Sequence, residues 1–142
     1  MKTVLVSGCS RGLGRLLAET LCGRGFTVYA GIRKEEDAAA LEDEWKKMKL
    51  DIRAVKLDVI SDEDCHQAVS RILKDEGRLD VLVNCASLVL AGPGDNFSAG
   101  EFLHLLNVNS VGPFRLIKEA ILPMRTQGGG RIINITSLNG RV

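Results

Sequence analysis

A short glycine-rich segment near the start of the chain constrains its fold more than any other part of the sequence. It reads Ser7-Gly8-Cys9-Ser10-Arg11-Gly12-Leu13-Gly14, follows the apolar run Thr3-Val4-Leu5-Val6 and leads into leucines at helical spacing. A strand, a glycine turn and a helix together let a nucleotide phosphate approach the main chain and the unpaired N–H groups of the helix N-terminus. We therefore expect a nucleotide at Gly8, Ser10, Arg11, Gly12, Leu13 and Gly14.

The rest of the sequence alternates between strand and helix patterns. Strands are expected at about 2–7, 26–30, 52–57, 79–84 and 131–136, and helices at about 12–24, 35–48, from Ser61 onward, and 99–126. Ser61 is a good N-cap, with Asp64 three residues later. This alternation without hairpin signals predicts an α/β fold, a Rossmann-like doubly wound parallel sheet with five strands present.

The sequence stops soon after the fifth expected strand, which leaves one face of the predicted sheet without a covering helix. We therefore expect residues 1–142 to form a single Rossmann-like dinucleotide-binding domain that is the N-terminal part of a longer domain. On this prediction the domain is truncated before its last strands and helices.

Composition excludes several classes of partner. The formal net charge is +1, so there is no electrostatic case for nucleic acid or membrane partners. No apolar run approaches the roughly 18 residues of a membrane span, and Met1-Lys2 leads directly into a strand, which leaves no room for a signal peptide. The four cysteines form no C-x-x-C pair and the two histidines have no ligand spacing, so we expect reduced thiols, no metal site and a cytoplasmic protein.

Two arginines favour NADP(H) over NAD(H) as the dinucleotide. An acidic residue about 20 positions after the glycine turn binds the ribose hydroxyls in NAD-binding folds, but this position falls on Ile32 and is followed by Arg33. Arg11 lies inside the turn itself. Two guanidinium groups can bind a 2′-phosphate through bidentate hydrogen bonds, although both can also be solvated surface charges.

Polar residues end the third and fourth expected strands. Asp58, followed by Val59, can accept a hydrogen bond from an adenine amino group or can simply cap the following turn. Asn84, in Asn84-Cys85-Ala86-Ser87, can flank the cofactor or can be purely structural. Ligands of open α/β sheets bind at the carboxyl ends of the strands, so we expect Asp58, Val59, Asn84 and Ala86 at the cofactor.

Asn109 is the polar residue of greatest interest in the long expected helix. It lies on the apolar stripe that we expect to be buried, made by Phe102, Leu105, Leu106, Leu116, Ile117 and Ala120. Pro113 has no N–H, so the Asn109 carbonyl loses its partner four residues later and can hold an ordered water. The alternative is a kinked helix whose Asn109 bonds to a neighbouring strand.

Together these motifs resemble those of the short-chain dehydrogenase/reductase family along the whole chain. Ser7 to Gly14 resembles the cofactor turn T-G-x-x-x-G-x-G, Asp58-Val59 resembles the adenine-contacting aspartate, and Asn84-Cys85-Ala86-Ser87 resembles a degraded N-N-A-G. The segment Asn107 to Gly112 resembles the helix whose asparagine, here Asn109, holds a proton-relay water. The segment Arg131 to Ser137 resembles the strand whose final serine, here Ser137, orients the substrate.

The resemblance implies an NADP-dependent oxidoreductase that interconverts an alcohol and a carbonyl by hydride transfer, with Asn109 and Ser137 in catalysis. It implies a small alcohol or carbonyl substrate, favours a hydrophobic one, and implies a homo-oligomer. The family's proton donor is the tyrosine of a Tyr-x-x-x-Lys motif beyond the serine, but five residues follow Ser137 and the single tyrosine is Tyr29. We therefore expect the isolated 142 residues to be inactive. The alternatives are a short nucleotide- or partner-binding protein without catalysis and, less compatible with the glycine spacing, a methyltransferase-like Rossmann protein.

Overall fold

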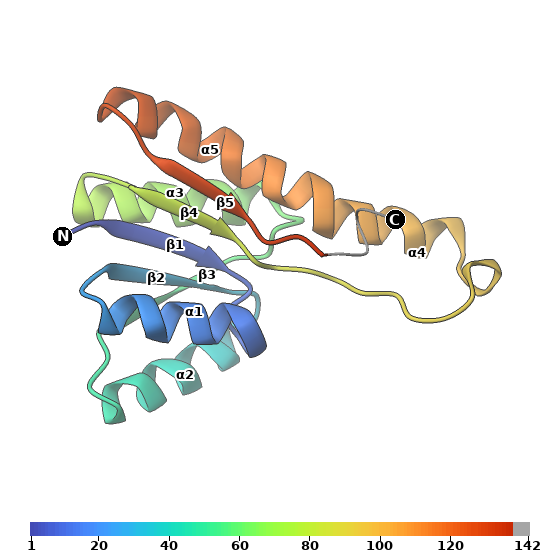
Figure 1. Ribbon diagram of the computed structural model, residues 1–142, viewed down its shortest axis with the longest axis horizontal. Coiled ribbons are helices and arrows are strands. Elements are labelled where there is room, and N and C mark those ends of the chain that lie inside the picture. Colours follow the sequence, from blue (N-terminus) through green and yellow to red (C-terminus); the bar gives the residue numbers. More distant parts are fainter. Residues whose placement is uncertain (138–142) are drawn as a thin grey trace.

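Five parallel strands form one sheet in the computed structural model, which describes residues 1–137 (Figure 1). The strands are β1 (Thr3–Ser7), β2 (Thr27–Ile32), β3 (Ile52–Lys56), β4 (Val81–Asn84) and β5 (Arg131–Asn134). Their order is β3-β2-β1-β4-β5, and Val6 of β1 lies between Ala30 of β2 and Val83 of β4. The predicted Rossmann-like fold is confirmed.

Helices cover both faces of the sheet. Helices α1 (Gly12–Gly23) and α2 (Glu35–Lys47) lie on one face, and α3 (Asp62–Glu76) and α5 (Gly112–Thr126) lie on the other (Figure 1). The side chains of β1 alternate between the two layers: Val4 and Val6 pack with the α1 side, whereas Leu5 packs with the α3 side. The N-cap expected at Ser61 is confirmed, because its hydroxyl accepts a hydrogen bond from the Asp64 amide at 3.1 Å.

The long helix expected at 99–126 is three segments, which corrects the sequence prediction. They are α4 (Ala99–Leu106), a π-helical turn η2 (Asn107–Val111) and α5, and a short 3₁₀ turn η1 (Gly94–Asn96) precedes them. The Gly112 amide bonds to the Asn107 carbonyl, five residues back, and Pro113 follows at the start of α5. A proline has no N–H to continue the regular ladder, so the chain changes its hydrogen-bond register just before it.

Much of the apolar stripe on this helical segment is exposed, which also differs from the prediction. Leu116 and Ala120 are buried, but Phe102 is 56% exposed and Leu106 is 36% exposed. The physical reason is that, within residues 1–137, α4 packs mainly against η2, the segment that continues it, rather than against the sheet.

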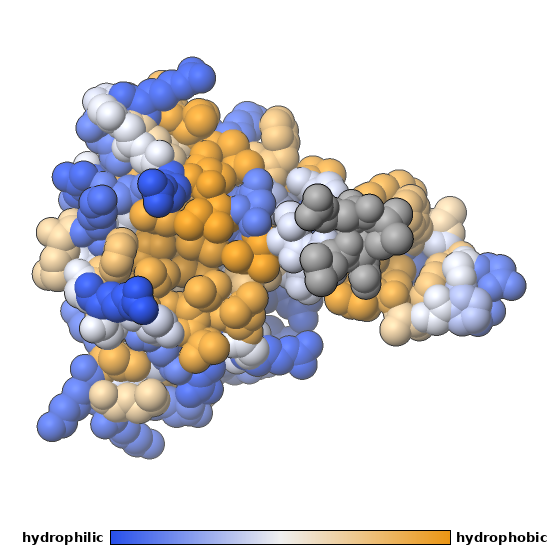
Figure 2. All heavy atoms as spheres, viewed as in Figure 1, coloured by the Kyte–Doolittle hydropathy of each residue, from blue (hydrophilic) through white to orange (hydrophobic). Residues whose placement is uncertain are grey.

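Within residues 1–137, the α1 face of the sheet is exposed at β5. Figure 2 shows hydrophobic side chains gathered over β4, β5 and α1 on the face in view. Exposed apolar residues on these elements are Leu13, Leu16, Ile133 and Ile135. No helix among the described residues is long and apolar enough to cross a membrane.

Candidate functional site

A cleft of about 1110 Å³ lies at the carboxyl ends of the strands. It spans the place where the strand order reverses, between β1 and β4, which is where open α/β sheets bind ligands. All thirteen residues singled out from the sequence line it: Gly8, Ser10, Arg11, Gly12, Leu13, Gly14, Arg33, Asp58, Val59, Asn84, Ala86, Asn109 and Ser137. Residues up to 129 positions apart in the sequence are thus brought to one cavity.

Close main-chain contacts require two of the glycines in the turn between β1 and α1. A Cβ on Gly14 would lie 2.3 Å from the carbonyl oxygen of Gly8, so a side chain there would push the helix away from the turn. Gly8 has a φ of +74°, and a Cβ on it would lie 2.7 Å from the Cα of Ala86. These two glycines therefore set the distance between β1, α1 and the end of β4.

The N-terminus of α1 is chemically suited to an anion. Arg11 is its N-cap residue and makes no side-chain capping bond, and the first turn contains no acidic residue. Gly12 has a φ of +60° and no atom within 4 Å of the place where its Cβ would lie. The positive end of the helix dipole and its unpaired amides therefore meet an open part of the cleft, and the site fits a nucleotide phosphate.

Ser7 supports this site, although it was not among the candidate residues predicted from the sequence. Its hydroxyl oxygen accepts hydrogen bonds from the amides of Cys85 at 3.0 Å and Ala86 at 3.1 Å. Ser7 is 1% exposed, and it connects the end of β1 to the segment that follows β4. A signal was present, since a hydroxyl residue directly before the glycine turn can bond to a neighbouring strand end.

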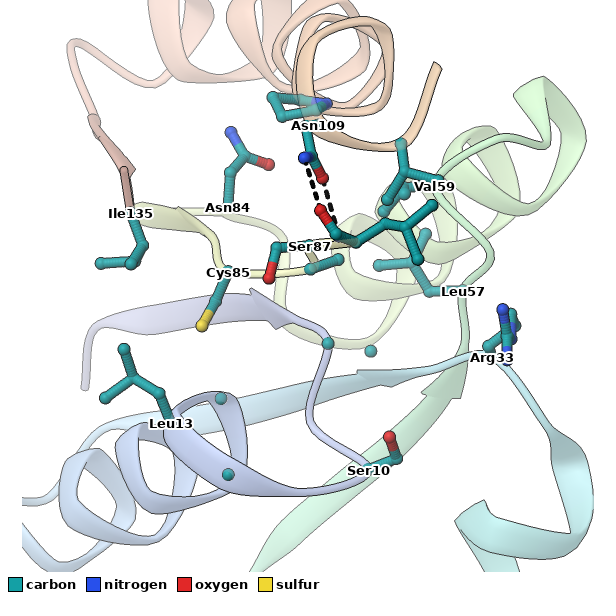
Figure 3. Close-up of a pocket in the computed structure, with 18 of the residues that line it drawn as sticks. Ser10, Leu13, Arg33, Leu57, Val59, Asn84, Cys85, Ser87, Asn109 and Ile135 are labelled. Atoms are coloured by element: carbon teal, nitrogen blue, oxygen red, sulfur yellow. Dashed lines mark hydrogen bonds between the residues drawn. The ribbon is translucent and has the colours of Figure 1, made fainter. Parts of the chain in front are cut away.

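Charged side chains line the end of the cleft formed by β2 and α1. Arg33 directly follows β2, and Arg11 and Lys34 line the same cleft. Figure 3 shows Arg33, after β2, and Ser10, in the turn before α1, at this end of the cavity. Asp37, in the first turn of α2, also lines the cleft. Sequence reasoning missed Lys34 and Asp37, because their position depends on how α2 leaves β2.

Asp58 caps its own turn in this structure. Its Oδ1 accepts a hydrogen bond from the Ile60 amide at 3.2 Å, and its own amide donates to Asp64 at 3.0 Å. Burial alone would raise the pKa of Asp64, but the hydrogen bonds from the Asp58 amide and from Lys56 outweigh it and lower that pKa. The connection between β3 and α3 is therefore held in one conformation along the cleft wall.

Asn84 has an unsatisfied acceptor beside the cleft. Its Nδ2 donates a hydrogen bond to Oδ1 of Asn134 on β5 at 2.8 Å. Asn84 is 4% exposed, and within the described residues its own Oδ1 is buried and has no hydrogen-bond partner. The sequence left open a purely structural role for Asn84. The structure shows such a role in part, because Asn84 joins β4 to β5 through a bond between two side chains. A buried carbonyl oxygen of this kind is ready to accept a hydrogen bond from a ligand or a water.

Asn109 is exposed rather than buried, which corrects the expectation from the apolar stripe. Its Nδ2 donates to the Leu88 carbonyl at 2.8 Å, and its Oδ1 accepts from the Leu88 amide at 2.8 Å. Figure 3 shows the side chain reaching from the helical segment to the chain just after Ser87. The sequence predicted a need for partners, and these partners come from the segment after β4.

The two cysteines near the glycine turn are free thiols with different environments. Cys9 is buried beneath the turn, and burial raises the pKa of its thiol to about 12. Cys85 lines the cleft and points toward Leu13 on the α1 side (Figure 3). Burial raises the pKa of Cys85 as well, so neither thiol is an activated nucleophile.

Ser137 lines the cleft just after β5, whereas the single tyrosine is elsewhere. Tyr29 is buried on β2, and its hydroxyl group hydrogen-bonds with Arg53, Asp75 and Glu76. It is absent from the cleft lining as the structure describes it. No group of three or more His, Cys, Asp or Glu side chains within residues 1–137 is arranged to hold a metal ion.

Comparison with known proteins identifies the family. The family described as "short chain dehydrogenase" matches residues 2–142. The chain belongs to the short-chain dehydrogenase family. Among curated relatives of this family, 3beta-hydroxysteroid dehydrogenase dhs-16 of Caenorhabditis elegans is 35% identical over 99% of this chain and 38% of its own length. Retinol dehydrogenase 5 of Homo sapiens is 33% identical over 98% of this chain and 43% of its own length.

A solved structure of the family has the same fold as this chain. Gluconate 5-dehydrogenase from Burkholderia cenocepacia J2315, in complex with NADP and tartrate, is 28% identical and superposes with a TM-score of 0.90. The match covers 99% of this chain and 55% of that one. This chain thus spans between 38% and 55% of the length of these three family members.

Proposed function

We propose that this chain is the dinucleotide-binding part of an NADP-dependent oxidoreductase that interconverts an alcohol and a carbonyl. The observation that carries the proposal is the cleft in which an uncapped helix N-terminus and two arginines, Arg11 and Arg33, line one cavity. The helix N-terminus suits the pyrophosphate, and the two guanidinium groups suit a 2′-phosphate. The solved relative bound to NADP supports this choice of cofactor.

The residues on the cleft wall have separable roles in this proposal. Gly8, Gly12 and Gly14 leave room for the pyrophosphate, and Asp58 and Val59 lie at the adenine. Asn84 and Ala86 flank the remainder of the dinucleotide. The nicotinamide cofactor supplies hydride transfer when it is bound. The protein's contribution is to hold the cofactor and exclude water along the cleft.

Two residues act on the substrate side: Ser137, in the segment after β5, and Asn109, in the middle of η2. Ser137 holds the substrate oxygen by a hydrogen bond, and the main-chain carbonyl of Asn109 holds a water in the proton path. Apolar side chains line the same cleft, which favours a hydrophobic substrate: Leu88, Val89, Ile117 and Ile135. Relatives named for a hydroxysteroid and for retinol support this substrate class.

The 142 residues alone are expected to bind cofactor without turnover. General acid catalysis needs a donor within hydrogen-bond reach of the substrate oxygen, and the hydroxyl of Tyr29 is already bonded to Arg53, Asp75 and Glu76. The same observation favours the second candidate, a nucleotide- or partner-binding protein without catalysis. The two candidate functions are separated by assaying the 142-residue chain and a longer form with NADPH and a panel of ketones and aldehydes. Turnover in the longer form alone supports the oxidoreductase, and turnover in neither form supports the protein without catalysis.

We also propose that the whole protein is a cytoplasmic homo-oligomer. The support for the oligomer is a set of exposed apolar side chains on α4 and α5, which a second copy would bury: Phe102, Leu103, Leu106 and Leu122. Sedimentation of a longer form at several concentrations measures this, and a monomer at every concentration would contradict it.

The cofactor preference is tested by titrating the 142-residue chain with NADPH and NADH. We expect tighter binding of NADPH, and Arg33→Asp should reverse the preference because a carboxylate repels the 2′-phosphate and accepts from ribose hydroxyls. The matched control is Arg24→Asp at the far end of α1, which makes the same charge change outside the cleft. Equal or tighter binding of NADH by the unsubstituted chain would refute the NADP assignment.

A further inference from the structure

The guanidinium group of Arg115, near the start of α5, bonds to three separate acceptors behind the cleft. Its Nε donates to Oδ1 of Asp62 at 2.8 Å, and its Nη1 donates to Oδ1 of Asn107 at 2.8 Å and to the Val59 carbonyl at 3.3 Å. Val59 belongs to the connection from β3 to α3, Asp62 is the first residue of α3, and Asn107 begins the π-helical turn η2. One side chain therefore joins two segments that lie nearly 50 residues apart in the sequence.

The arrangement of hydrogen bonds around Arg115 matters more for this contact than the charge of its ion pair with Asp62. The Arg115 side chain is 18% exposed, but that of Asp62 is 89% exposed, and an ion pair with a solvated partner contributes little stability. A guanidinium group presents five donors in a rigid plane, so it can hold several acceptors at fixed positions at once. A lysine has a single mobile ammonium group and cannot reproduce this arrangement.

Both segments that Arg115 joins form walls of the cleft. Asp58 and Val59 line it from the β3 side, and Val108, Asn109 and Ser110 line it from η2. Arg115 itself is outside the cleft lining. The two walls also touch directly, because a Cβ on Gly112 would lie 2.8 Å from Cγ2 of Val59. The contacts of Arg115 and Gly112 therefore set how closely the β3 wall and the η2 wall of the cleft approach each other.

The η2 turn has a particular need for such support. Its π-helical hydrogen bonds are a rare variant of the helical ladder, and they include the bond from the Gly112 amide to the Asn107 carbonyl. Arg115 bonds to the side chain of the same Asn107. It thus holds the residue at which the hydrogen-bond register changes.

We propose that Arg115 is a positioning residue for cofactor binding, which holds η2 against the β3–α3 connection and so fixes the cleft before the cofactor enters. This inference rests on the proposed function, since it concerns the same cleft. A wall that is already ordered does not have to be ordered by the ligand, so the contact raises affinity without touching the cofactor.

The test compares NADPH affinity in the 142-residue chain and its variants. We expect Arg115→Lys and Arg115→Met to weaken NADPH binding by about tenfold, and Asn107→Ala to weaken it by less. Adding Asn107→Ala to Arg115→Met should cause little further loss, because both changes remove the same contact. Hydrogen exchange should become faster at the amides of residues 58–62 and 107–112 in these variants.

Arg78→Ala is the matched control, because Arg78 pairs with Asp80 outside the cleft lining. It should lower the melting temperature and leave NADPH affinity within about twofold. If Arg115→Met does not fold, Asp62→Ala combined with Asn107→Ala removes two side-chain acceptors and keeps the arginine. Unchanged affinity in the folded Arg115 variants, or an equal loss in Arg78→Ala, would overturn the proposal.

The outcome also distinguishes this inference from the proposed function. If the unsubstituted chain binds neither NADPH nor NADH, the proposed function fails. Hydrogen exchange then decides the role of Arg115 by itself: faster exchange in both segments supports the bridge between the two walls, and unchanged exchange overturns it.

Discussion

The side-chain amide of Asn109 and the main chain of Leu88 form two reciprocal hydrogen bonds, each 2.8 Å long. Asn109 is on the π-helical turn η2, and Leu88 is in the segment that follows β4. The donor and acceptor of the amide are both used, so the side chain fixes the course of the chain beside the cleft. Any role in a proton path then falls to the Asn109 main chain.

Asn109→Ala should release the segment around Leu88. The Leu88 amide and carbonyl would bond to water instead, so we expect a stability loss of only about 1 kcal/mol. Hydrogen exchange at residues 87–90 should become faster, with NADPH affinity nearly unchanged. In a longer, active form, turnover should fall.

Asn109→Asp is the informative comparison, because it keeps the acceptor for the Leu88 amide and loses the donor to the carbonyl. The hydrogen-exchange rate at residues 87–90 in Asn109→Asp should lie between the rates in the wild type and in Asn109→Ala. A large loss of NADPH binding in Asn109→Ala, with turnover per bound enzyme retained, would show that the residue holds the nucleotide instead.

Ser7→Ala should destabilise the chain by about 1–3 kcal/mol, because the partly buried Cys85 and Ala86 amides lose their shared acceptor. Ser7→Thr keeps the hydroxyl oxygen and should restore most of the stability. Urea unfolding followed by circular dichroism measures both variants. Equal stability of Ser7→Ala and the wild type would mean that water replaces the hydroxyl.

Gly14→Ala should reduce both stability and NADPH affinity. The new Cβ would lie 2.3 Å from the Gly8 carbonyl oxygen, a main-chain atom that cannot move without displacing the turn. Gly23→Ala is the matched control in the same helix, since it has no atom within 4 Å of its Cβ position. The control should gain about 0.5–1 kcal/mol of stability. Tight NADPH binding by Gly14→Ala would contradict the close packing of turn and helix.

The ionisation of Asp80 should make the stability of the chain depend on pH. The hydrogen bond from Arg78 lowers the pKa of Asp80 below its ordinary value of 3.8, and the Thr3 amide contributes in the same direction against the effect of burial. The folded state therefore binds this proton less readily than the unfolded state does. Stability from Asp80 is present above the ordinary value and is lost as pH falls through the lower, folded pKa.

The measurement is urea unfolding of the wild type and Asp80→Asn between about pH 6 and about pH 2. The wild type should be more stable by about 1–3 kcal/mol at the upper end, and the difference should shrink toward the lower end. A difference that stays constant across this range would show that the charge of Asp80 contributes nothing.

The order of strands and helices could be predicted because each depends on local pattern. Apolar runs such as Val4-Leu5-Val6 and the cap at Ser61 act within a few residues, so the sequence alone carries them. The thirteen candidate residues followed from several local signals: the glycine turn, the arginine after the second strand, the residues at strand ends, an asparagine on an apolar stripe and the family resemblance. The role of each residue stays a prediction.

Other features depended on contacts that no local pattern contains. The sequence placed Asn109 on a buried stripe, but the change to π-helical register before Pro113 turned it toward Leu88 and left it exposed. The three acceptors of Arg115 lie 8, 53 and 56 positions away in the chain.

The sequence by itself therefore determined the Rossmann-like sheet, its glycine turn and which strand ends line the cleft, because periodicity and glycine spacing act locally. The tertiary structure alone decided which side chains support those strand ends, as with Ser7 beneath Cys85 and Arg115 between Val59 and Asn107. A hydrogen bond between distant segments exists only after the sheet and helices have packed, so its partners cannot be read from either segment by itself.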